Sequence, residues 1–104
     1  MVNQEELLNR LLEAFKTEAD ERLKALTNGL LELEKIPAFE KQVGIIETLF
    51  REMHSMKGAS RSVNRTDIES VCQSYESVLS KLKRGEISLS PALFDLLYHV
   101  LDMI

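Results

Sequence analysis

The chain has 104 residues, which fits one small domain, and its hydrophobic fraction of 44% is enough for a single core. The formal net charge of -4 argues against general nucleic-acid binding. No apolar run approaches the ~20 residues of a membrane span, and the first residues lack the features of a signal peptide. The single cysteine, Cys72, excludes an internal disulfide. We therefore expect a small buried thiol and a reduced, cytoplasmic setting.

The first expected helix covers about residues 3–35. Asn3 is positioned to cap it, with Glu6 three residues later at the capping-box position. Gly29 costs about 1 kcal/mol relative to alanine, but the apolar stripe keeps its phase beyond it, so we predict one long helix. The stripe has steps of three and four and consists of Leu8, Leu11, Leu12, Phe15, Ala19, Leu23, Leu26, Leu30 and Leu33.

The second expected helix covers about residues 38–60. Pro37 disfavours a helical Ile36 and is suited to the first turn of this second helix. Asn64, which follows the helix, can adopt the left-handed conformation common after a helix end. The apolar stripe consists of Phe39, Val43, Ile46, Leu49, Phe50 and Met53.

The third expected helix covers about residues 67–84. Thr66 and Glu69 have the spacing of a capping box, and Gly85 provides a stop. Its apolar stripe consists of Ile68, Val71, Cys72, Tyr75, Leu79 and Leu82.

The fourth expected helix begins with Ser90 as cap and Pro91 in the first turn. Its apolar residues are Leu93, Leu96, Leu97, Val100, Leu101 and Ile104. Four amphipathic helices with short connections predict an all-α, antiparallel up-and-down four-helix bundle. Because the stripe still runs at Ile104, we expect residues 1–104 to be one domain of a longer protein, with either a fifth helix or a linker lost.

A histidine, a lysine and a glycine lie close together on the second expected helix. At about 100° per residue, His54 falls at the edge of the apolar stripe, so one side of its ring can face water. Lys57 and Gly58 follow at i+3 and i+4 on the same flank. The lysine can hold a negative group beside the ring. Glycine is unfavourable within a helix, so its presence indicates a need for access.

Two polar residues, Gln73 and Glu76, share the edge of the third helix's stripe. If the second and third helices are antiparallel neighbours, Glu76 can approach His54 across the groove between them. A carboxylate that accepts the Nδ1–H fixes the tautomer and leaves Nε2 bare. It also makes Nε2 more basic and nucleophilic.

The stretch LFREMHSMKGAS, residues 49–60, resembles the H-x-x-K-G phosphoacceptor motif of histidine phosphotransfer (HPt) domains. It is most similar to the amino-terminal HPt domain of CheA-type chemotaxis histidine kinases. The stretches TEADERLKAL (17–26) and KLKRGEISLSPALFDLLYHVLDMI (81–104) resemble the same family's helices. The resemblance covers nearly the whole chain.

The resemblance implies a role for each residue of the constellation. His54 is the phosphorylated residue, Lys57 assists the phosphoryl group, Gly58 opens the surface and Glu76 hydrogen-bonds the histidine. Gln73 stands where close relatives often carry a second histidine, and glutamine can form hydrogen bonds but cannot titrate.

The resemblance also implies the partners. A CheA-type kinase domain presents ATP, and His54 passes the γ-phosphoryl to an aspartate of a CheY-like or CheB-like response regulator. ATP and Mg²⁺ belong to those partners, and we expect no cofactor, nucleic acid or membrane insertion for this domain. The sequence has no phosphate-cradling loop, so we expect it to be part of a histidine kinase without being catalytic alone.

Two other interpretations of the His54 region are a metal site and a surface that only docks partners. A metal site at His54 lacks a second histidine or cysteine at ligand spacing. An HPt-like bundle that docks signalling partners without accepting phosphate remains the alternative. Arg51, Arg61 and Arg65 either form a basic rim that favours an acidic partner or are ordinary solvated charges.

Overall fold

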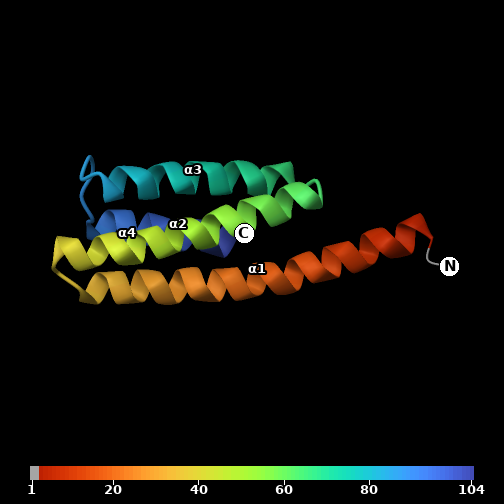
Figure 1. The fold of residues 1–104 in the computed structure, drawn as a ribbon, viewed down its shortest axis with the longest axis horizontal. Coiled ribbons are helices and arrows are strands. Elements are labelled where there is room, and N and C mark those ends of the chain that lie inside the picture. Colours follow the sequence, from red (N-terminus) through yellow and green to blue (C-terminus); the bar gives the residue numbers. More distant parts are fainter. Residues whose placement is uncertain (1–2) are drawn as a thin grey trace.

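The computed structural model describes residues 3–104, a part of the chain in which there is no strand. Consecutive helices run antiparallel, α2 packs against both α1 and α3, and α4 lies against α1 (Figure 1). The predicted all-α helical bundle is confirmed. The helices are α1 (Gln4–Lys35), α2 (Phe39–Ser62), α3 (Thr66–Lys83) and α4 (Pro91–Met103).

The four helices differ greatly in length. α1 has 32 residues, whereas α2 has 24, α3 has 18 and α4 has 13. At 1.5 Å per residue α1 is about 48 Å long, and its N-terminal part extends past the turn between α2 and α3 (Figure 1). Leu8 and Leu11 on this part are 49% and 47% exposed. The apolar stripe predicted that these two residues are buried, and this prediction was wrong, because no described helix runs beside them.

The core is one cluster to which all four helices contribute buried residues. Phe39 and Leu96, predicted to belong to apolar stripes, are instead 51% and 55% exposed, and Phe50 is only half-buried. Met56, which we did not include in the stripe of α2, is fully buried. The most deeply buried apolar residues are Leu26, Leu30, Leu33, Ile46, Leu49, Met53, Met56, Cys72 and Leu79.

Gly29 of α1 lies directly against the side chain of Leu49 on α2. A Cβ atom at this position would lie 2.5 Å from Cδ2 of Leu49 on α2, closer than two carbon atoms can approach. α1 continues through Gly29 as one helix, as predicted. The glycine is thus explained by packing between helices, not by a break in α1.

Several predicted helix ends are confirmed. Asn3 Oδ1 accepts a hydrogen bond of 2.7 Å from the backbone N–H of Glu6, and Ser90 Oγ accepts one of 3.1 Å from that of Leu93. Asn64 and Gly85 both have positive φ, at 59° and 73°, as the turns after α2 and α3 require.

Two expected features of the helix starts were wrong, although the starts themselves lie within one residue of the predicted positions. Pro37 lies outside α2, which begins at Phe39 after the cap residue Ala38. Thr66 is the first residue of α3, and no side chain caps that end. The Glu69 carboxylate, which a capping box would need, instead forms an ion pair with Arg61 of α2. A contact between helices thus replaces the local cap.

Charged residues occur along all four helices. In the part that the structure describes, residues 3–104, no helix is both long enough and apolar enough to cross a membrane.

Replacement of two glycines by alanine should have opposite effects on stability. Gly44→Ala places its Cβ in open space, so it should stabilise the protein by about 0.5–1 kcal/mol through helix propensity. Gly29→Ala should destabilise it by about 1 kcal/mol, because overpacking against Leu49 costs about 1–3 kcal/mol. Urea denaturation midpoints test both. A similar rise of the denaturation midpoint in both variants would contradict the close packing of Gly29 against Leu49.

The thiol of Cys72 should be unreactive while the protein is folded. Burial, reinforced by the charge of Glu76, raises the pKa of Cys72 from 9.0 to about 11, which lowers the thiolate fraction at pH 8 about 100-fold. Alkylation by iodoacetamide, followed by mass spectrometry, should therefore be slow in buffer and fast in urea. Equal rates in the two conditions would contradict the burial.

Candidate functional site

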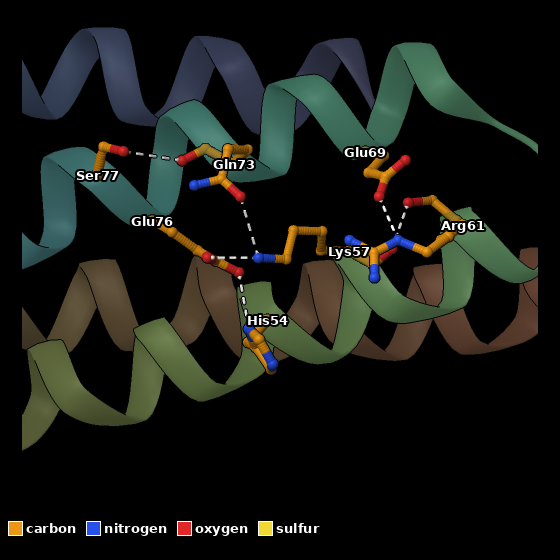
Figure 2. Close-up of polar contacts among 8 residues, drawn as sticks. His54, Lys57, Arg61, Glu69, Gln73, Glu76 and Ser77 are labelled. Carbon is orange, nitrogen blue, oxygen red and sulfur yellow. Dashed lines mark hydrogen bonds and ion pairs between the residues drawn. The ribbon is translucent and has the colours of Figure 1, made fainter.

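The candidate site lies along the groove between α2 and α3. His54 and Lys57 come from α2, three residues apart, and Gln73 and Glu76 come from α3 with the same spacing (Figure 2). Because the helices are antiparallel neighbours, the two pairs face each other. The structure thus brings together four side chains that the sequence analysis placed at the edges of two stripes.

Glu76 is the centre of this group. Its side chain is only 6% exposed, yet each carboxylate oxygen has a partner on α2. Oε1 lies 3.1 Å from Nδ1 of His54, and Oε2 accepts a 2.9 Å hydrogen bond from Nζ of Lys57. A buried carboxylate is stable only when it is paired and hydrogen-bonded, and these two contacts meet that requirement.

The contact with Glu76 determines which nitrogen of His54 is free. A carboxylate next to an ammonium group can only accept a hydrogen bond, so Nδ1 must donate its proton. The neutral ring then has its lone pair on Nε2. The His54 side chain is 64% exposed, and the far edge of the ring points away from Glu76 (Figure 2). The site therefore presents an oriented, accessible nitrogen nucleophile.

Lys57 is turned toward α3. Its side chain is 12% exposed, and Nζ also donates a 3.1 Å hydrogen bond to Oε1 of Gln73. Gln73 therefore contacts the group through Lys57. Ser60, which the sequence analysis did not single out, is fully buried and donates to the backbone carbonyl of Lys57 at 2.8 Å. Two of the three N–H donors of Lys57 are used by α3.

Gly58 is exposed on α2 one turn after His54. A Cβ atom at this position would meet no heavy atom within 4 Å, so packing does not require glycine here. The contrast with Gly29 is direct, because packing excludes a side chain there. A larger side chain at position 58 would stand beside the imidazole on the same helix flank.

The three arginines considered as a basic rim have local partners. Arg61 forms an ion pair with Glu69 across the same groove (Figure 2). Arg65 pairs with Asp67 at 3.1 Å, and Arg51 donates to the hydroxyl of Thr48 at 3.2 Å. Carboxylates thus neutralise two of the three, which weakens the expectation of a basic rim.

Within residues 3–104, no group of three or more His, Cys, Asp and Glu side chains is arranged to hold a metal ion. The second histidine, His99, is exposed on α4.

Several known proteins resemble this chain over most of its length. The family model described as "Hpt domain" matches residues 10–104. Chemotaxis protein CheA of Bacillus subtilis is 30% identical over 95 residues, and sensor histidine kinase CheAY of Helicobacter pylori is 29% identical over 96 residues. These matches cover 91% and 92% of the chain, but only 14% and 12% of the two relatives.

A solved structure has the same fold. The CheA phosphotransferase domain from Thermotoga maritima superposes with a TM-score of 0.82 at 30% sequence identity. The match covers 92% of this chain and 88% of that domain. The likeness therefore extends over nearly the whole bundle, including the groove between α2 and α3.

Replacement of the carboxylate by an amide should reverse the tautomer of His54. In Glu76→Gln, Lys57 can only donate and should hold the amide oxygen. The amide NH₂ then faces Nδ1, which must accept, so the ring proton moves to Nε2. The ring ¹⁵N chemical shifts should report this change for His54 and none for His99. Retention of the proton on Nδ1 in the variant would contradict the assigned contacts.

Proposed function

Because the chain belongs to the Hpt domain family, we propose that His54 is the residue that carries the phosphoryl group. The histidine phosphotransfer role in chemotaxis-type two-component signalling follows from the family match and from the likeness to CheA. One observation supports the choice of His54. Its Nδ1 is held by the buried Glu76 while 64% of its side chain is exposed.

The first step of the proposed mechanism is attack on ATP. The Nε2 lone pair attacks the γ-phosphorus, the bond from that phosphorus to the bridging oxygen breaks, and ADP leaves. The ring becomes positively charged and keeps its proton on Nδ1. Glu76 stabilises this charge through the hydrogen bond already present, so little reorganisation is needed.

The second step returns the ring to its starting form. An aspartate oxygen of a receiver domain attacks the phosphorus, the Nε2–P bond breaks, and its electron pair goes back to Nε2. Because Nδ1 carries a proton throughout, the leaving group is a neutral imidazole. The same hydrogen bond thus serves both acceptance and release.

The remaining site residues have supporting roles in this proposal. Lys57 holds the second oxygen of Glu76 and has one N–H left for a phosphoryl oxygen. Gln73 keeps Lys57 turned toward α3. Gly58 leaves room for the bulky ATP or receiver domain beside the ring. These roles rest on the distances given above and on the open space at position 58.

The partners follow from the chemistry. The bundle supplies a nucleophile, so we propose that a CheA-type kinase domain, in the same or another polypeptide, supplies ATP and Mg²⁺. A response-regulator receiver domain of the CheY or CheB kind, with its own Mg²⁺, then takes the phosphoryl. Residues 1–104 form the single phosphotransfer domain in this scheme, and its proposed location is the cytoplasm, where ATP is found.

Labelling with ATP tests the proposal. The wild-type chain, incubated with a CheA kinase core and γ-labelled ATP, should gain an acid-labile label. His54→Gln should lose it by at least ~100-fold, because the nucleophile is gone. His99→Gln is the matched control, since it removes the other histidine on the exposed side of α4, and it should be labelled normally.

Three outcomes can be told apart. No label on the wild type would reject phosphotransfer and favour a bundle that only docks partners. Label that persists in His54→Gln would reject the assignment of the site. Loss of label in His99→Gln with wild-type labelling intact would move the phosphorylated residue to α4.

A further inference from the structure

Phe50 lies one helical turn before His54, and its ring faces the imidazole. The two ring centroids are 6.3 Å apart and the planes differ by only 9°. The spacing of four residues places both side chains on the same flank of α2. Offset parallel stacking of this kind is a favourable arrangement for aromatic rings.

Phe50 is itself held in place. It is half-buried and lines a groove of about 230 Å³ between α2 and α3, together with Ile46 and Leu79. Both of these neighbours are almost fully buried, at 2% and 0% exposure. The Phe50 ring therefore rests on the core and has less freedom than the exposed His54 ring.

The hydrogen bond to Glu76 alone does not fix the plane of the imidazole. It holds one atom, Nδ1, at 3.1 Å from Oε1, a length that still allows the ring to rotate by a limited amount about χ1 and χ2, the two bonds that join it to the backbone. The lone pair on Nε2 lies in the ring plane, so such a rotation turns it away from an incoming phosphorus. In-line attack depends strongly on such alignment. A second restraint on the ring plane is therefore needed, and a parallel neighbouring ring provides one.

We propose that Phe50 is a positioning residue, which acts through His54 by restricting the plane of the imidazole so that Nε2 points out of the groove. The inference rests on the proposed function and adds to it a residue outside the H-x-x-K-G motif. Glu76 sets the tautomer and one point of the ring, whereas Phe50 sets its plane. The chemical step is the one described above, in which Nε2 attacks the phosphorus while Nδ1 keeps its proton.

A small phosphodonor separates positioning from partner docking. Phosphoramidate needs no protein partner: Nε2 attacks its phosphorus, the donor's P–N bond breaks and ammonia leaves. Phe50→Leu keeps an apolar side chain in the groove but removes the ring. It should slow labelling by phosphoramidate about threefold to tenfold, a factor in keeping with the strength of an aromatic pair. Phe50→Tyr keeps the ring and should stay within about twofold of wild type.

Phe39→Leu is the matched control. It removes a phenyl ring from the first residue of the same helix, where the side chain is 51% exposed. Its labelling rate should equal that of wild type. Circular dichroism checks the fold of each variant, and Phe50→Met replaces Phe50→Leu in all comparisons if the latter loses helix.

Relaxation of the His54 ring carbons in NMR gives a readout that does not depend on phosphorylation. The ring should be more mobile in Phe50→Leu than in wild type and unchanged in Phe39→Leu. Unchanged mobility in Phe50→Leu would overturn the inference.

The labelling outcomes separate this inference from the proposed function. Equal phosphoramidate rates in wild type and Phe50→Leu would reject positioning and leave phosphotransfer intact. Slowing with the kinase but not with phosphoramidate would make Phe50 a docking contact instead, which also rejects positioning. Equal slowing in Phe50→Tyr would reject the role of the ring. No labelling of wild type by either donor would reject the proposed function itself.

Discussion

A carboxylate buried between two helices must have a partner for each oxygen, and in this bundle both partners come from the opposite helix. Glu76 of α3 contacts His54 through one oxygen and Lys57 through the other, at 3.1 and 2.9 Å. Loss of one partner from a buried charged pair typically costs about 3–5 kcal/mol. The carboxylate that orients the histidine therefore also holds α2 against α3, through its ion pair with Lys57. Stability and reactivity depend on the same side chain.

This arrangement divides the His54 ring into two parts. The Nδ1 edge faces the protein, where Nδ1 donates a hydrogen bond to Glu76, and the Nε2 edge faces the solvent. The proposed phosphotransfer role needs this division, because the ring must be fixed enough to react and open enough to meet the two proposed partners. The positioning role proposed for Phe50 is of the same kind, since its stacked ring restrains the imidazole while the side chain of His54 stays 64% exposed.

α1 packs along α2, the helix that carries His54 and Lys57. Gly29 allows the two helices to approach until Leu49 fills the space that a side chain would take. Arg22 of α1 and Glu52 of α2 add a partly buried ion pair of 2.9 Å. α2 is therefore held on both flanks, by α1 through close packing and by α3 through the charged group around Glu76. A rigid α2 keeps His54 and Lys57 in register with α3.

The sequence by itself determined the number and order of the helices, because apolar residues at steps of three and four and caps such as Asn3 and Ser90 act over a few residues. Helical periodicity also placed His54 and Glu76 at the edges of their apolar stripes, where they can face each other across a groove. Only the tertiary structure decided what depends on distant neighbours. The stripe of α1 predicted burial at Leu8, yet Leu8 is 49% exposed, because no described helix runs beside it. The length of a helix relative to its neighbours is not a local property. Thr66 had the spacing of a cap, yet the carboxylate it needed was taken by an arginine from another helix. Periodicity can assign a side chain to a face of a helix, but a hydrogen bond goes to whichever partner the packing brings within about 3 Å.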